Sequence, residues 1–190
     1  MILREHLNSY YRFIPFMKPE MLMLGRQTNT SGWKLPCDYK TLDPDGGDFQ
    51  ADLGEPLKDG GESIRASDLC AWKTVFNLGT LEHIWDIHQA YVNAASMVAS
   101  NGYFLGQSPV AGWEGHGVHV TEWSFIHEFF SRNGFMINAQ WFTTQAGNEC
   151  DKPKRNGGKS ILYWFAAKRV AVIPLSYKPS QFYHNGVKPS

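Results

Sequence analysis

Three side chains in the central part of the chain could move a proton: Glu82, His83 and His116. Glu82 and His83 are adjacent and follow a strand-like apolar run, whereas His116 lies between two glycines. A histidine whose pKa is near the working pH can take a proton from a hydroxyl or an amine. Flanking glycines leave the imidazole as the only functional group of that segment. The sequence therefore predicts His116 as a general base, with His83 and Glu82 orienting a substrate.

Residues that could hold a nucleoside-type cofactor follow the first strands predicted from the sequence. Gly25 comes after the first strand, Asp43 ends the second, and Asp52 lies in the third. An acidic residue that ends the second strand of an open parallel sheet can accept both hydroxyls of a ribose. A glycine after the first strand lets the backbone approach the cofactor closely. Asn77 and Gly79, which follow the fourth strand, complete the predicted cofactor side.

Each of these residues also has an interpretation without a ligand. Asp43, beside Pro44 and Gly46, can be an ordinary turn residue, and Asp52 can cap the turn that follows it. Gly79 can be only a strand-to-helix turn, Glu82 suits the first turn of any helix, and His83 can be a half-buried, satisfied side chain.

A metal site is not expected. His116 and His119 are three residues apart, and His83 or His127 could join them. Imidazole suits zinc, copper, iron and nickel. No carboxylate or cysteine set accompanies these histidines, so we predict no metal.

The elements that must position these residues alternate between strands and helices. Strands are predicted at residues 21–24, 39–42, 49–53, 72–78, 103–106, 135–143 and 161–167. Helices are predicted at residues 2–17, from Leu81 (with Thr80 as N-cap) to Gly102, and at residues 123–132. This alternation favours an α/β fold with a largely parallel sheet, whose strand ends gather the candidate residues at one edge.

Composition narrows the class of protein. Residues 1–190 suit a single domain, and 43% apolar residues exclude a disordered chain. Eighteen basic and eighteen acidic residues cancel, which argues against a nucleic-acid partner. The sequence shows no membrane span and no signal-peptide core. Three widely spaced cysteines favour a reducing, cytoplasmic location.

Four segments of the chain resemble class I S-adenosylmethionine-dependent methyltransferases, most of all bacterial branches associated with sugar and cell-surface glycan biosynthesis. The resemblance extends over residues 72–136, and over residues 20–55 Leu24-Gly25, Leu42-Asp43 and Asp52-Leu53 stand in the expected order. The segments are Phe76-Asn77-Leu78-Gly79-Thr80-Leu81-Glu82-His83-Ile84, Asn101-Gly102-Tyr103-Phe104, Gly115-His116-Gly117 and Asn133-Gly134-Phe135. The resemblance implies S-adenosylmethionine as cofactor and a Rossmann-like three-layer sandwich. Its mostly parallel seven-stranded sheet would have an antiparallel last strand.

The chain departs from that family near its N-terminus. The family usually has a GxGxG motif after the first strand, but here Gly25 is followed by Arg26-Gln27-Thr28-Asn29. Only 13 residues separate Gly25 from Tyr39, and only five separate Asp43 from Phe49. A parallel crossover needs about a dozen residues and is usually helical, so we expect the early crossover helices to be shortened.

Two functions follow from these observations. The first is methyl transfer from S-adenosylmethionine to a small polar or sugar-type acceptor, with no nucleic-acid or membrane partner and with homo-oligomerisation open. The second is a methyltransferase-like fold without catalysis that serves as a binding or structural component.

Overall fold

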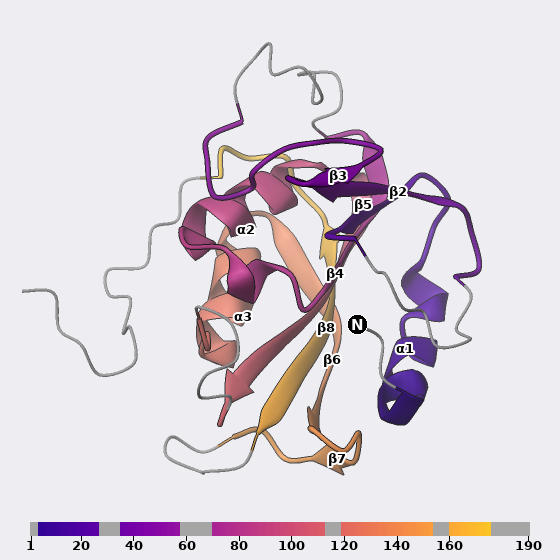
Figure 1. Cartoon of the computed structure of the whole chain (residues 1–190), viewed down its shortest axis with the longest axis vertical. Helices are drawn as coiled ribbons and strands as arrows, with labels where there is room; N and C mark the ends of the chain where they lie inside the picture. The colour runs from indigo at the N-terminus through magenta and orange to yellow at the C-terminus, as the bar shows by residue number, and fades with distance from the viewer. Residues whose placement is uncertain (1–3, 27–34, 58–69, 113–118, 154–159, 176–190) are drawn as a thin grey trace, which may run out of the picture.

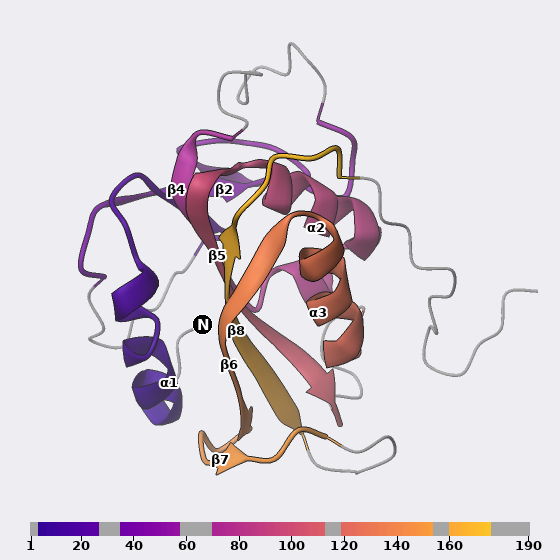
Figure 2. The same ribbon diagram turned by 180° about the vertical axis from the view of Figure 1, so that it is seen from behind.

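The computed structural model describes residues 4–26, 35–57, 70–112, 119–153 and 160–175. His116, the predicted base, lies outside these residues. The described part forms three layers (Figures 1 and 2), in which a central sheet has two helices on one face and the N-terminal helical segment on the other. The α/β Rossmann-like prediction is thereby confirmed.

The sheet is eight-stranded and mixed, which corrects the seven-stranded, mostly parallel prediction. Its order is β3-β2-β1-β4-β5-β8-β6-β7. Strands β1, β2, β4 and β5 pair in parallel, whereas β8 is antiparallel to both of its neighbours, as predicted. The strands are β1 (Met21–Leu24), β2 (Tyr39–Asp43), β3 (Gly46–Gly47), β4 (Trp72–Leu78), β5 (Val98–Ala111), β6 (Phe135–Thr144), β7 (Glu149–Cys150) and β8 (Ile161–Arg169).

Strand β1 has apolar side chains on both faces of the sheet, so both faces have to be buried. All four of its residues are buried. Because successive strand side chains point to opposite faces, Leu22 and Leu24 join the core under the helices α2 (Ile87–Ser96) and α3 (Trp123–Arg132). Met21 and Met23 join the second core, beneath the N-terminal segment.

That N-terminal segment contains a 3-10 turn at Arg4–His6, helix α1 (Leu7–Tyr11) and a second 3-10 turn at Ile14–Phe16. The predicted continuous helix at residues 2–17 is therefore interrupted. Tyr10 and Phe13 are buried against Trp164 of β8, with ring centroids 5.2 and 6.0 Å away.

The helix predicted from Leu81 begins later than expected. Leu81–His83 form a 3-10 turn (η4), and Ile84 is extended, with φ −91° and ψ 130°. Asp86, rather than Thr80, caps α2 by accepting a hydrogen bond from the Gln89 N–H at 2.9 Å. Gly102 lies inside β5 instead of ending the helix.

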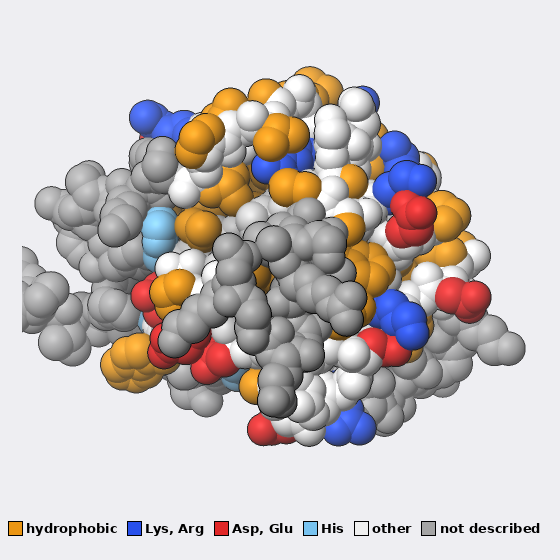
Figure 3. Space-filling model, turned by 90° about the horizontal axis from the view of Figure 1, so that it is seen from above, with side chains coloured by type: hydrophobic (Ala, Val, Ile, Leu, Met, Phe, Trp, Pro, Cys, Tyr) orange, Lys and Arg blue, Asp and Glu red, His pale blue; other side chains and the backbone are white. Residues whose placement is uncertain are grey.

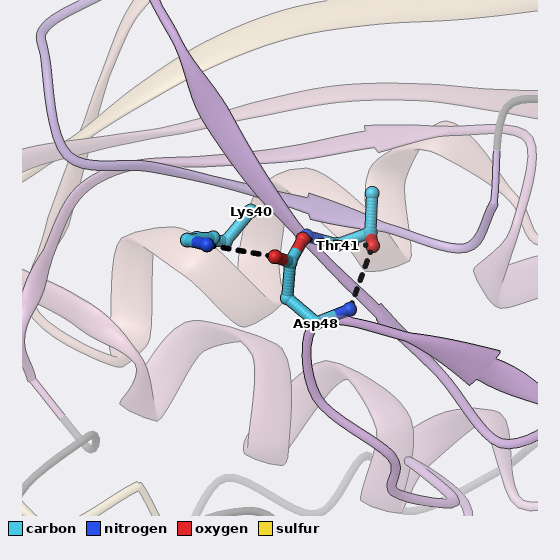
Figure 4. Close-up of polar contacts among 3 residues, drawn as sticks. All are labelled: Lys40, Thr41 and Asp48. Carbon is cyan, nitrogen blue, oxygen red and sulfur yellow. Dashed lines mark hydrogen bonds and ion pairs between the residues drawn. The ribbon is translucent and has the colours of Figure 1, made fainter.

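The third predicted strand, residues 49–53, is not formed. Only Phe49 bridges to β2, opposite Leu42. Next to it, the Asp48 carboxylate accepts hydrogen bonds from the Thr41 N–H (2.9 Å) and from Lys40 Nζ (2.8 Å), while the Asp48 N–H donates to Thr41 Oγ1 at 3.1 Å (Figure 4). These bonds hold the pKa of Asp48 below its usual value, with the Lys40 contact as the largest cause. The Asp48 carboxylate thus accepts the Thr41 N–H, a hydrogen bond that a neighbouring strand would otherwise accept at this edge of β2.

The early crossovers are described only in part. Residues 25–26 and 35–38, between β1 and β2, contain no α-helix, nor do residues 44–57 and 70–71 between β2 and β4. In the described part of the chain, no helix combines the length and the apolar character required to cross a membrane.

Candidate functional site

The carboxyl ends of β1 and β2 bring two predicted cofactor residues together. The register sets Leu24 opposite Leu42, so Gly25 and Asp43 follow at the same edge. The Gly25 N–H donates to the Leu42 carbonyl at 2.8 Å, and the Arg26 N–H donates to Asp43 Oδ2 at 3.0 Å. The sequence prediction that these two residues meet is confirmed.

Gly25 lies in a conformation and a space that suit glycine. Its φ is +77°, and a Cβ built there would lie 2.5 Å from Thr80 Oγ1. The Thr80 hydroxyl donates to the Leu24 carbonyl at 2.9 Å. The Thr80 side chain therefore packs directly on the backbone of Gly25, where β1 ends beside the turn that follows β4.

Gly25→Ala is expected to destabilise the folded chain by about 1–3 kcal/mol, because a left-handed φ costs an L-residue about 1–2 kcal/mol and the methyl group would also meet Thr80. Urea denaturation measures this loss. The double variant Gly25→Ala with Thr80→Ala removes the two shortest contacts, those with Thr80 Oγ1 and Cγ2, and leaves the φ cost; Thr80→Ala alone corrects for the lost hydroxyl bond to Leu24. A Gly25→Ala protein as stable as the wild type would contradict the close approach of these two segments.

Asp43 is half-buried and is held by the main chain on both oxygens. Besides the Arg26 N–H on Oδ2, the Asp45 N–H donates to Oδ1 at 2.9 Å. Each carboxylate oxygen has further acceptor capacity, so two ribose hydroxyls could still bind. The turn interpretation and the cofactor interpretation of Asp43 are thus compatible.

Asp52 and Asn77 also contact main chain. Asp52 is exposed and accepts from the Gly54 N–H at 2.7 Å, which is the turn-capping arrangement. The buried Asn77 side chain donates to the Gln107 carbonyl at 3.1 Å and accepts from the N–H groups of Thr80 and Leu81. Asn77 therefore fixes the turn after β4, and its contact with a cofactor stays a prediction, as does that of Asp52.

Two acceptor oxygens flank Gly79, directly after β4. Gly79 has φ +70°, and a Cβ built on it would lie 3.0 Å from Glu82 Oε1 and 3.4 Å from Gln107 Oε1. The residue itself is only half-buried. Side-chain oxygens from η4 and β5 thus lie close to the position that a Cβ would take on Gly79.

Glu82 is a buried carboxylic acid at this edge of the sheet. It is 3% exposed, and its Oε2 is buried with no hydrogen-bond partner. Burial raises the pKa of Glu82 to about 7, against smaller lowerings by its own backbone N–H and by the positive charge of the N-terminus. Its charge also contributes to the raised pKa of buried Tyr91 on α2, although burial is the main cause there. The Tyr91 hydroxyl lies 3.1 Å from Ser108 Oγ.

His83 and His119 differ in burial. His83 is exposed in η4, next to Glu82. His119 is buried, its N–H donates to the Glu82 carbonyl at 3.0 Å, and its Nε2 lies 2.8 Å from the Trp85 carbonyl. His119 thereby ties the segment before α3 to the loop after η4. Trp85, in that loop, is 82% exposed.

Sequence reasoning missed Thr80, Gln107 and Tyr91 as members of this edge. Gln107 directly follows the predicted strand 103–106, so the rule that ligands bind beyond strand ends could have found it. Tyr91 falls inside the helix predicted from Leu81 to Gly102, and only tertiary packing brings it near Glu82. Within the described ranges, no three His, Cys, Asp or Glu residues are grouped to hold a metal ion.

Comparison with known proteins addresses the fold. No protein-family model and no curated protein sequence matches the chain. Among solved structures, a methyltransferase candidate from Bacillus halodurans C-125 superposes with a TM-score of 0.59 at 9% identity, covering 87% of this chain and 99% of that one. The 1,6-didemethyltoxoflavin-N1-methyltransferase of Burkholderia thailandensis, solved with 1,6-didemethyltoxoflavin and S-adenosylhomocysteine, superposes with a TM-score of 0.55 at 10% identity, covering 86% and 77%. The chain therefore has the Rossmann-like fold of class I methyltransferases.

Proposed function

We propose that this chain transfers a methyl group from S-adenosylmethionine to a small-molecule acceptor, of a small polar or sugar type. The observation that carries the proposal is the meeting of Gly25 and Asp43 at the ends of β1 and β2, in a fold shared with methyltransferases. The B. thailandensis relative in fold holds S-adenosylhomocysteine and a small-molecule substrate, which supports both the cofactor and the acceptor class.

The described residues fit this cofactor. Neither Gly25 nor Gly79 has room for a Cβ, and the Asp43 carboxylate keeps acceptor capacity that ribose hydroxyls could use. When bound, S-adenosylmethionine supplies an electrophilic methyl group. The residues of this chain hold the acceptor in line and remove its proton; positioning accounts for much of the rate in such a displacement. His116 is our proposed base, with Glu82 and His83 orienting the acceptor.

A second function is a non-catalytic binding component with the same fold. The Thr80 hydroxyl bond to the Leu24 carbonyl favours it, because this bond joins the ends of β1 and β4 directly. In either case the three free cysteines support our proposal of a reducing compartment such as the cytoplasm.

Calorimetric titration with S-adenosylhomocysteine tests the function. We expect binding by the wild type, and a 10- to 100-fold weaker affinity for Asp43→Ala, since a hydrogen bond to a charged group contributes about 1.5–3 kcal/mol. Asp38→Ala, which removes an exposed carboxylate just before the same strand, is the matched control and should bind normally. Absence of binding by the folded wild type would favour the non-catalytic function.

A further inference from the structure

We propose that His6 is a pH-sensitive switch: protonation of its ring in mildly acidic solution opens the N-terminal segment (residues 4–16) away from the face of the sheet that this segment covers (Figures 1 and 2). The inference goes beyond the proposed function and does not depend on it.

The His6 ring is buried without a hydrogen-bond partner. The residue is 3% exposed, neither Nδ1 nor Nε2 has a partner within hydrogen-bonding geometry, and the ring centroid lies 5.6 Å from that of Trp164 in β8. Natural proteins rarely leave a buried polar group unpaired unless it has a role. A neutral imidazole tolerates this position, whereas an imidazolium would bury a positive charge at a high cost in free energy. The closed segment therefore favours a neutral His6.

The groups that face His6 do not reverse this preference. Loss of hydration on burial lowers the pKa of His6 below its ordinary value of 6.5, and it outweighs the opposing effects of the exposed Glu5 carboxylate and of the Gln145 main chain. Glu5 belongs to the same segment as His6. The side chains that face the ring from the sheet, Trp164 of β8 and Gln145 after β6, are both uncharged.

Proton linkage gives the direction of the switch. In the open segment His6 is hydrated and titrates near 6.5, whereas in the closed segment its pKa is lower. The open state therefore binds a proton over a pH range in which the closed state does not, so a fall in pH favours opening. One histidine can shift this equilibrium by at most a factor of about ten between about pH 7.5 and 5.5.

The segment depends on its packing against the sheet. Helix α1 has 5 residues, which is too short for stability in isolation. His6 is the N-cap of α1 but makes no side-chain cap hydrogen bond, and a positive charge at this end would also oppose the helix dipole. The closed state is therefore held by the buried rings of Tyr10 and Phe13 and by the exposed ion pair of Arg12 with Glu149 of β7.

Opening removes packing from the strand that carries the candidate site. Phe13 contacts Phe76 of β4 edge to face, with ring centroids 5.3 Å apart. The next residue of β4, Asn77, fixes the following turn by accepting from the N–H groups of Thr80 and Leu81. The N-terminal segment thus supports β4 directly before this turn, and the switch links that support to pH.

Amide hydrogen exchange of the full chain tests the proposal, with each rate divided by the intrinsic rate at the same pH. We expect the protection of residues 7–16 in the wild type to fall about five- to tenfold between about pH 7.5 and 5.5. His6→Phe and His6→Gln remove the titrating group, so both should keep constant protection over this range. His83→Gln, at an exposed histidine, is the matched control and should respond to pH as the wild type does.

Three results would overturn the switch. The first is constant protection of the wild-type segment over this pH range, and the second is an equal fall in the wild type and in both His6 variants. The third is a segment that is already open at about pH 7.5 in both variants, since the shape of the imidazole rather than its charge would then hold the segment closed. Where only one variant is open at that pH, the other decides.

Discussion

Glu82→Gln is expected to stabilise the folded chain above about pH 7 by roughly 1–3 kcal/mol, and to have little effect below about pH 4. Burial raises the pKa of Glu82 from 4.5 to about 7. Between these values the folded state keeps a proton that the unfolded state has released. The free energy of unfolding of the wild type therefore falls as pH rises through this window, and above the folded pKa the full cost of the buried charge is present.

Glutamine has nearly the same shape and never ionises, so it avoids this cost. At about 1.4 kcal/mol per pKa unit the charge costs about 3 kcal/mol, and burial of the glutamine amide offsets part of the gain. Urea unfolding of both proteins at about pH 4, 6 and 8 measures the difference, with Glu128→Gln as the exposed control. A difference that is constant with pH would show that Glu82 does not titrate as a buried group.

A functional residue that lowers stability is an expected compromise at a binding site. Natural proteins rarely keep a buried polar atom without a partner unless it has a role. Gain of stability together with loss of ligand binding or turnover in Glu82→Gln would be the signature of such a site.

Trp164→Ala is expected to lower the free energy of unfolding by roughly 3–5 kcal/mol, as is typical for truncation of a buried large aromatic side chain. Trp164 is fully buried in β8 and stacks on Trp141 with an interplanar angle of 5°. Its Nε1–H donates to Thr143 Oγ1 at 2.8 Å, so the variant also leaves a buried hydroxyl without its donor. Tyr10 and Phe13 lose the surface on which they pack.

Chemical denaturation followed by circular dichroism measures this loss. Trp85→Ala is the matched control, because Trp85 is 82% exposed and its removal should change stability by less than about 0.5 kcal/mol. A Trp164→Ala protein within about 1 kcal/mol of the wild type would contradict the packing of the N-terminal segment on β8.

The sequence alone predicted most strands, because their hydrophobic runs are short, β-rich and bounded by turns. Met21–Leu24 reads as a buried strand and is one, since both faces of the sheet are covered. The helix Trp123–Arg132 was predicted with its observed bounds because Asn133 and Gly134 end it clearly; Gly134 has φ +80°. Gly25, Asp43 and Gly79 follow the first, second and fourth strands, and the sequence could place them at one edge because the carboxyl ends of parallel strands lie at the same edge of a sheet.

Hydrophobic periodicity predicted two elements wrongly, and their true form depends on tertiary structure. Residues 49–53 alternate like a strand but do not pair as one, because β2 ends at Asp43, one residue beyond the bridge between Leu42 and Phe49, and the chain then turns back into β3. The sequence predicts one helix from Leu81, yet Ile84 is extended and Asp86 is the N-cap of α2.

The candidate site shows the same division. The sequence identified Glu82 by its type and its place after a strand. Its burial, and the Gln107 oxygen beside it, depend on how β5 and α2 pack around the turn at Gly79. Local sequence determines which residues follow a strand, whereas the energy of a charge depends on what surrounds it in space. Here Gln107, 25 positions further along the chain, is part of the surroundings of Glu82.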